Sequence, residues 1–266
     1  MCGRHCTTSE HIRQMTTWAK HDSLTSGGWC ARCRTVHTLP VEPAREECYA
    51  LMDLLQRHRR LDWSVTREAA DPRCSTEMLF GDAGGKMFGV LCGRSTDGAR
   101  VVLRAFSGQL NGLWQVDGWV GPIFDTAVFA DLVREPEREI KRIGQEIAQS
   151  VPGSSFYRQL KEERRACSRQ LMQNIHGLYR LINFRGEVAA MANVFLGSGE
   201  PPSGTGDCCG PKLLHCAAVN GIRPEAMAEF YWGQENSSGT RTHGQLYPAC
   251  AAKCAPILGF QLCGLA

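Results

Sequence analysis

The sequence lacks any hydrophobic run of roughly 18 or more residues, which a membrane-spanning helix would need. Residues 1–6 contain no apolar stretch, so we expect no secretory signal and a cytoplasmic protein without a membrane partner. Charge of one sign is also scarce, because 30 Lys and Arg residues stand against 27 Asp and Glu residues, a net charge of +3. This small excess does not by itself indicate a nucleic-acid-binding protein.

Two common catalytic motifs are missing as well. The sequence contains neither the Gly-x-Ser-x-Gly motif of serine hydrolases nor the Gly-x-x-x-x-Gly-Lys-Ser/Thr loop that binds phosphate. It has no internal repeat and no low-complexity tract, and its 43% hydrophobic residues suffice for a folded core. We therefore expect a folded domain whose chemistry does not come from either motif.

Cysteine is the residue in excess, with 14 in the chain. This density is below that of small disulfide-stabilised proteins, and in a reducing compartment clustered cysteines more often bind metal or take part in catalysis. Cysteines that stand alone in the sequence are expected to be small buried hydrophobic residues. These isolated cysteines are Cys48, Cys74, Cys92, Cys167 and Cys263.

The hydrophobic spacing predicts an α/β fold with a layered sheet. Residues 1–34 are polar and show no sustained period, so we expect a poorly ordered tail before a single domain over residues 35–266. Apolar residues at helical spacing predict a helix over residues 43–60. Residues 85–108 are typical of two strands joined by a turn at Asp97-Gly98.

A long helical hairpin is predicted as an insertion at about residues 126–182, broken at residues 151–153. Its second helix carries a row of basic side chains. Such a row is either a solvated face or a surface that contacts phosphate. As candidate RNA-binding residues we take Arg158, Lys161, Arg164, Arg165 and Arg169.

Two groups of cysteines fall where helices are expected to begin. The sequence predicts one helix starting near Asp207 and a last helix opening at Pro248, with a strand at residues 227–233 between them. A helix N-terminus favours the thiolate that binds metal. A tetrahedral zinc site could therefore be formed by ligands from the set Cys208, Cys209, Cys250, Cys254 and His243. The Cys-x-x-x-Cys spacing is not the usual Cys-x-x-Cys, so buried cysteines without metal remain an alternative.

This order of hairpin, helix, strand and helix is similar to that of the zinc deaminases. In those enzymes a His/Cys-x-Glu motif opens the first helix, a Pro-Cys-x-x-Cys motif opens the second, and the glutamate moves the proton. Aligning the first motif with residues 208–210 places Gly210 where the glutamate should be. Asp207 and Glu229 are the candidate acids nearby, although neither occupies that position. The similarity therefore predicts a deaminase-like architecture whose activity would need an unconventional proton carrier.

A third group of cysteines lies near the N-terminus, interleaved with histidines. It could form a small zinc knuckle, whose folding free energy the metal would have to supply. The group consists of Cys2, Cys6, Cys30 and Cys33 with His5, His11 and His21.

Several long motifs distinguish the chain. They are GKMFGVL at residues 85–91, AFSG at 105–108, GTGDCCGPKLL at 204–214, AMAEFYWG at 226–233, HGQLYPAC at 243–250 and KCAPIL at 253–258. Together these motifs resemble the N-terminal region of long bacterial RluA-type RNA pseudouridine synthases. The resemblance covers roughly residues 36–265, which is most of the chain.

The resemblance implies an RNA-associated accessory module rather than the synthase itself. In the long synthases the catalytic domain follows this region, whereas the present chain stops at residue 266, about where the linker would begin. Arg60-Leu61-Asp62 matches a tripeptide around the catalytic Asp of some synthases, but the Thr-Ser-Gly that should follow is absent, so we interpret it as coincidence. The partners implied are RNA, above all ribosomal RNA, and a pseudouridine synthase catalytic domain.

Three functional hypotheses therefore stay open. The first is the RNA-associated accessory module, with zinc as a structural cofactor. The second is a zinc-dependent deaminase of nucleosides or nucleic-acid bases. The third is a metal-free protein-interaction domain. Whether the chain is an enzyme is not decided by the sequence, because the catalytic Asp motif of the synthases is absent and the deaminase glutamate is displaced.

Overall fold

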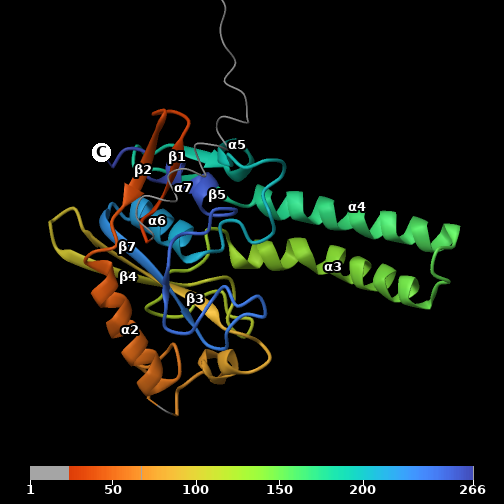
Figure 1. Cartoon of the computed structure of the whole chain (residues 1–266), viewed down its shortest axis with the longest axis horizontal. Helices are drawn as coiled ribbons and strands as arrows, with labels where there is room; N and C mark the ends of the chain where they lie inside the picture. The colour runs from red at the N-terminus through yellow and green to blue at the C-terminus, as the bar shows by residue number, and fades with distance from the viewer. Residues whose placement is uncertain (1–23, 67, 266) are drawn as a thin grey trace, which may run out of the picture.

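A computed structural model of the chain describes residues 24–66 and 68–265. Its centre is an antiparallel four-stranded sheet with the strand order β4-β3-β7-β8 (Figure 1). The strands are β3 (Lys86–Arg94), β4 (Arg100–Phe106), β7 (Arg223–Trp232) and β8 (Leu246–Tyr247). The predicted hairpin and the predicted strand at residues 227–233 are confirmed as β3–β4 and β7.

The turn between β3 and β4 shows why the hairpin was visible in the sequence. Gly98 has φ +85°, a left-handed conformation that glycine adopts without steric cost. The amide of Gly98 donates a hydrogen bond to the carbonyl oxygen of Ser95 at 2.9 Å. The pairing then runs from Arg94↔Arg100 to Phe88↔Phe106 without a break.

Helices cover both faces of the sheet, which makes the fold a layered α/β arrangement and confirms the predicted class (Figure 1). Helix α2 (Ala44–His58) packs on the face that carries Phe88 and Phe230. Helix α6 (Cys209–Val219) packs on the opposite face, and α7 (Ala255–Gln261) packs against α6. Side chains alternate along each strand, so consecutive residues of β7 belong to different layers.

The predicted helical insertion is also confirmed. Helices α3 (Thr126–Gln149) and α4 (Ser155–Gly177) form an antiparallel pair that projects away from the sheet (Figure 1). Asp125 caps α3 by accepting hydrogen bonds from the amides of Ala127 and Val128, which satisfies two free N–H groups. Among the described residues, no helix combines the length and the apolar character needed to cross a bilayer.

A small hairpin precedes the main domain. Strands β1 (Ser26–Cys30) and β2 (Thr35–Leu39) pair antiparallel, so residues 24–34 are not the poorly ordered tail that their polar composition predicted. Glycine explains the difference: a Cβ at Gly28 would lie 2.2 Å from the carbonyl oxygen of Ala255. The missing side chain lets β1 approach the backbone of α7, a contact that hydrophobic periodicity cannot indicate. The remainder of the predicted tail, residues 1–23, lies outside the described residues.

The last helix begins later than the sequence predicts. It opens at Ala255 rather than near Pro248, and residues 250–254 form a turn before it. The amides of Cys254 and Ala255 both donate to the carbonyl oxygen of Cys250, at 3.1 Å. Pro256 stands in the first turn of α7, where its missing N–H costs no helical hydrogen bond.

The remaining elements are short. They are the 3₁₀ helices η1 (Pro72–Cys74) and η2 (Glu77–Phe80), the paired strands β5 (Arg180–Ile182) and β6 (Val188–Ala190), and α5 (Met191–Val194).

Candidate metal centre

Three cysteines from two separate segments meet beside the sheet. The sulfur atoms of Cys208, Cys250 and Cys254 all lie within 4.8 Å of one another. Cys208 is the N-cap residue of α6, and the other two cysteines bracket the turn that precedes α7. Cys254 is buried, while Cys208 and Cys250 are half-buried. The group is therefore open to solvent on one side.

The spacing of the sulfur atoms is compatible with a bound metal ion, for which zinc gives the reference distances. Four sulfur ligands at about 2.3 Å from zinc in a tetrahedron would be about 3.8 Å apart. The Sγ atoms of Cys250 and Cys254 are 3.6 Å apart, close to that spacing. In the described part of the chain, no fourth His, Cys, Asp or Glu belongs to this group. Three protein ligands with one position free is the arrangement of catalytic zinc sites, whereas structural sites have four.

The three thiols already share their protons unequally. Hydrogen bonds with Cys208 and then with Cys254 lower the pKa of Cys250. The contact with Cys250 raises the pKa of Cys208, and contacts with Cys208 and then Cys250 raise the pKa of Cys254. A thiolate is the form of cysteine that binds metal. Cys250 is therefore the sulfur most prepared to do so.

Glu229 places a carboxylate at the start of α6. It lies on β7 with its side chain only 4% exposed, and its Oε1 accepts a hydrogen bond from the amide of Gly210 at 3.0 Å. Burial raises the pKa of Glu229 to about 7, although the Gly210 amide opposes that change. Gly89, its partner on β3, provides the space, because a Cβ there would lie 3.3 Å from Glu229 Cγ.

Two of the expected ligands lie elsewhere. Cys209 points into the sheet, where its thiol donates to the carbonyl oxygens of Met87 and Ala105 at 3.4 and 3.5 Å. Adjacent residues at a helix start point in different directions, so only one of Cys208 and Cys209 can face the other cysteines. His243 accepts a hydrogen bond from the Gly233 amide at 3.1 Å and is not part of the three-cysteine group.

Asp207, the other candidate acid, is hydrogen-bonded to a residue that follows α4. It accepts a short hydrogen bond from the hydroxyl of Tyr179. Burial raises the pKa of Asp207, and the contact with Tyr179 opposes that rise. Tyr179 follows α4 and anchors the base of the helical hairpin, where its ring lies 5.2 Å from that of Phe124. Asp207 therefore joins the start of α6 to the inserted hairpin.

The basic residues of α4 differ in their surroundings from those of α3. On α3, Arg134, Arg138 and Arg142 form ion pairs with acidic residues one turn away. On α4 the five candidate cations are exposed, and within the described residues none forms an ion pair. Their charge therefore remains available to a ligand.

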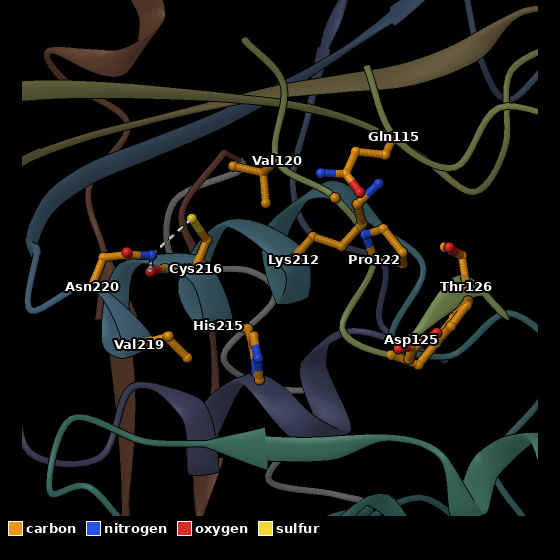
Figure 2. A pocket seen from close by; sticks show the side chains of 12 residues that line it. Gln115, Val120, Pro122, Asp125, Thr126, Lys212, His215, Cys216, Val219 and Asn220 are labelled. Atoms are coloured by element: carbon orange, nitrogen blue, oxygen red, sulfur yellow. Dashed lines mark hydrogen bonds between the residues drawn. The ribbon is translucent and has the colours of Figure 1, made fainter. Parts of the chain in front are cut away.

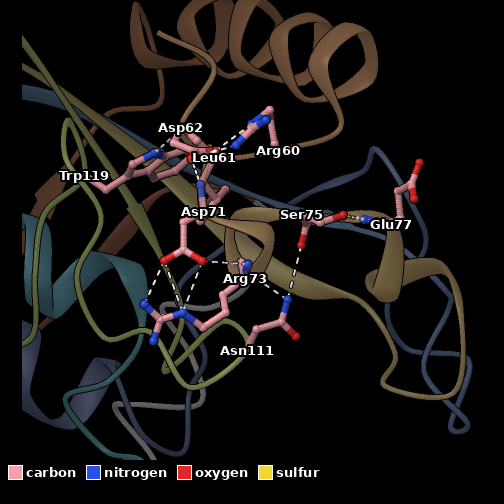
Figure 3. A network of polar contacts seen from close by, with 9 residues as sticks. All are labelled: Arg60, Leu61, Asp62, Asp71, Arg73, Ser75, Glu77, Asn111 and Trp119. Atoms are coloured by element: carbon pink, nitrogen blue, oxygen red, sulfur yellow. Dashed lines mark hydrogen bonds and ion pairs between the residues drawn. The ribbon is translucent and has the colours of Figure 1, made fainter. Parts of the chain in front are cut away.

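The Arg60-Leu61-Asp62 tripeptide is part of a structural network (Figure 3). Arg60 donates two hydrogen bonds to the Asp62 carboxylate, at 2.6 and 2.7 Å, and the Asp71 amide donates a third at 3.0 Å. The indole of Trp119 donates to the carbonyl oxygen of Leu61 at 3.0 Å. With its acceptor positions occupied in this way, Asp62 holds together a loop and supplies no free carboxylate.

A pocket of about 390 Å³ lies beside α6 and residues 115–126 (Figure 2). Lys212 and His215 contribute to its wall, and the three cysteines and Glu229 do not. The ammonium of Lys212 is buried and donates to the carbonyl oxygen of Phe106 at 2.8 Å. Lys212 therefore joins α6 to β4, and we assign the pocket no part in the metal centre.

The N-terminal cysteine group is only partly within the described residues. Cys2, Cys6, His5, His11 and His21 lie outside them. Cys30 and Cys33 lie inside and meet two residues that the sequence analysis did not connect with them, His37 and Cys263. The other isolated cysteines lie apart from both groups: Cys48, Cys74 and Cys92 are buried, as expected of small hydrophobic residues, and Cys167 is half-buried.

We compared the chain with protein-family models, with curated proteins and with solved structures, and no match was found in any of the three.

Proposed function

We propose that Cys208, Cys250 and Cys254 bind a zinc ion and that the site hydrolyses an exocyclic amino group of a nucleobase. The observation that carries this proposal is the position of Glu229. In zinc deaminases the glutamate stands two residues after the first ligand, which here is Gly210. The Glu229 carboxylate reaches the amide of that same residue from β7. Glu229 therefore brings a carboxylate to the residue at which the deaminase motif has its glutamate.

The order of the elements also supports the proposal. The two cysteine-bearing segments precede α6 and α7, which pack against each other and have β7 between them in the chain. When bound, the zinc would act as a Lewis acid at the site of hydrolysis. Its three ligands leave one coordination position for chemistry.

The role of Glu229 is to move a proton. Its carboxylate would accept a proton from the attacking water and deliver it to the departing amine. A C–O bond forms and the C–N bond breaks, which releases ammonia and leaves a carbonyl group without any change of oxidation state. The Gly210 amide holds the carboxylate in place for both transfers.

The experiment is an ammonia-release assay on the zinc-loaded full chain. The substrates are cytidine, adenosine and single-stranded oligonucleotides that contain these bases. We expect Glu229→Gln to lower kcat by roughly 10²- to 10⁴-fold and to leave the zinc content unchanged. Glu235→Gln, which changes an exposed glutamate just after β7, is the matched control. Full activity of Glu229→Gln, or no ammonia from any substrate, would contradict the proposal.

A second function is favoured by the unpaired cations of α4. We infer that this helix binds RNA through its phosphates, as the resemblance to the N-terminal region of RluA-type synthases also implies. Salt-dependent binding is the expected signature, because each phosphate contact releases counterions. Under this hypothesis the RNA target would be ribosomal, and a synthase catalytic domain would be a partner.

Charge reversal tests this second function. Arg164→Glu with Arg165→Glu should weaken RNA binding and flatten the dependence of log K on log salt concentration. The matched control is Arg134→Glu with Arg138→Glu on α3, an equal change of charge at arginines that already have acidic partners. Equal losses in both double variants would show that net charge, rather than α4, governs binding.

A further inference from the structure

Four potential metal ligands gather at the junction between the first hairpin and the end of the chain. Cys30, Cys33, His37 and Cys263 each offer one ligand atom, and these atoms all lie within 4.8 Å of one another. The sulfur atoms of Cys33 and Cys263 are 3.5 Å apart, although the two residues are 230 positions apart in the sequence. The group shares no residue with the three-cysteine centre.

The turn between β1 and β2 has the cysteine spacing of a metal-binding turn. Cys30 and Cys33 form a Cys-x-x-Cys pair, the spacing typical of structural zinc sites. Arg34 then adopts φ +54°, which closes the turn, and its amide donates to the carbonyl oxygen of Cys30 at 2.8 Å. Cys30 is buried at the end of β1, and Cys33 is half-buried in the turn that follows.

The imidazole of His37 has a buried nitrogen atom without a hydrogen bond to any of the described residues, which is an independent observation in favour of a ligand here. That atom is Nε2. A buried ring nitrogen without a partner costs free energy, and coordination to a metal would remove that cost. The residue is paired with Gly28 in the β1–β2 hairpin.

A positive charge stands beside the fourth ligand. The Nε of Arg185 donates to the sulfur of Cys263 at 3.4 Å. Three thiolates and a neutral histidine around Zn²⁺ carry one excess negative charge. The Arg185 guanidinium balances that charge and holds Cys263 in its orientation.

We propose that Cys30, Cys33, His37 and Cys263 form a structural zinc site that fastens the β1–β2 hairpin to the end of α7. Four protein ligands close the coordination sphere, which is the arrangement of structural rather than catalytic zinc. Near this site the backbone of α7 approaches the backbone of β1 closely. A Cβ at Gly259 would be 2.0 Å from the carbonyl oxygen of Trp29. The metal thus secures two backbones whose contact offers little hydrophobic surface of its own.

The first test follows each cysteine in the native full-length chain. Alkylation is measured by mass spectrometry with one set of samples in Zn²⁺ and one in a chelator. We expect zinc to slow the labelling of Cys33 by at least about tenfold, since a coordinated thiolate is not free to react. Cys167, which is also half-buried but lies on α4, is the internal control and should label at one rate throughout. A Cys33 rate that ignores zinc, or a Cys33–Cys263 disulfide in the zinc-loaded protein, would overturn the proposal.

The second test separates the two metal sites. In Cys254→Ser, which disables the three-cysteine centre, added Co²⁺ should still produce thiolate-to-cobalt charge transfer and the visible absorption of tetrahedral cobalt. Adding Cys33→Ser to that variant should abolish both signals, whereas adding Cys167→Ser should not. If Cys254→Ser alone removes every cobalt signal while the fold is retained, the hairpin site does not exist. Should Cys254→Ser fail to fold, the alkylation test decides the matter by itself.

Discussion

The Glu229 carboxylate and the Gly210 amide are joined by a hydrogen bond of 3.0 Å, although β7 and α6 place them 19 residues apart. The bond holds a buried acid against the helix whose N-cap residue is Cys208. Gly210 has no side chain, so nothing intervenes between the amide and the carboxylate. The absence of a side chain at Gly210 therefore leaves the space that the Glu229 carboxylate occupies.

Gly210→Ala should displace Glu229. The new Cβ would lie 2.9 Å from Glu229 Oε1, so the buried carboxylate would have to move. We expect loss of about 1–3 kcal/mol in the free energy of unfolding, a typical result of overpacking, together with loss of any ammonia release. Gly144→Ala, in the middle of α3 with space for a Cβ, should instead stabilise by about 0.5–1 kcal/mol. Denaturant unfolding of both variants provides the measurement, and equal stabilities would refute the expectation.

Neighbouring cysteines should respond differently to the same substitution. Cys208→Ser removes a ligand and should lower zinc occupancy at the three-cysteine centre at least about tenfold. Cys209→Ser alters a thiol that bonds to Met87 and Ala105, so it should retain the metal and affect stability alone. Zinc content per chain after dialysis against a weak chelator distinguishes them when both variants also carry Cys33→Ser, which removes the proposed hairpin site. The ligand assignment fails if Cys209→Ser loses the metal and Cys208→Ser keeps it.

Asp62 should contribute stability that depends on pH. Burial alone would raise the pKa of Asp62, but hydrogen bonds from Arg60 and the Asp71 amide lower it overall. A carboxyl whose pKa is depressed by folding stabilises the protein above its unfolded pKa of about 3.9, and this contribution is lost as the pH falls through the folded value. Asp62→Asn should cost about 1–3 kcal/mol at pH 7 and flatten the acid limb of the stability curve. The exposed Asp53→Asn is the control, and parallel pH curves for the two variants would contradict this role.

Gly259→Ala should separate the first hairpin from α7. The added Cβ would lie 2.0 Å from the carbonyl oxygen of Trp29, and backbone atoms cannot yield without moving the strand. We expect faster hydrogen exchange of the β1 and β2 amides, with little change in β3 and β7. Gly177→Ala, which meets no atom within 4 Å at the end of α4, should leave exchange in both regions unaltered. Unchanged exchange in β1 after Gly259→Ala would show that the close contact is not needed.

The parts of the fold that the sequence predicted are those with a strong local pattern. The Asp97-Gly98 turn predicts the β3–β4 hairpin from two residues, and the apolar stripes of α3 and α4 predict helices from the spacing of neighbouring residues. The β1 strand was missed because its sequence, SGGWC, has little hydrophobic content and pairs through backbone approach. The start of α7 was placed too early because a proline at residue 248 and one at residue 256 are equally suitable for a first helical turn.

The two candidate metal sites were predictable only in part, for a geometric reason. Two cysteine-bearing helix starts indicated the first centre, but the choice between Cys208 and Cys209 depends on how the helix is rotated against the sheet. The second centre needs Cys263, which looked like an isolated hydrophobic residue. Cys263 lies close to Cys33 because α7 contacts β1. A contact between residues so far apart in the chain cannot be predicted from local spacing.

The length of the projecting helical hairpin limits how much of a nucleic acid can lie along it. Helix α3 has 24 residues, which at about 1.5 Å per residue gives roughly 36 Å from base to tip. For comparison, roughly ten base pairs of double-stranded DNA, at about 3.4 Å each, extend over the same length. A mononucleoside is far shorter than this length, so contact along the whole arm would require a polymer.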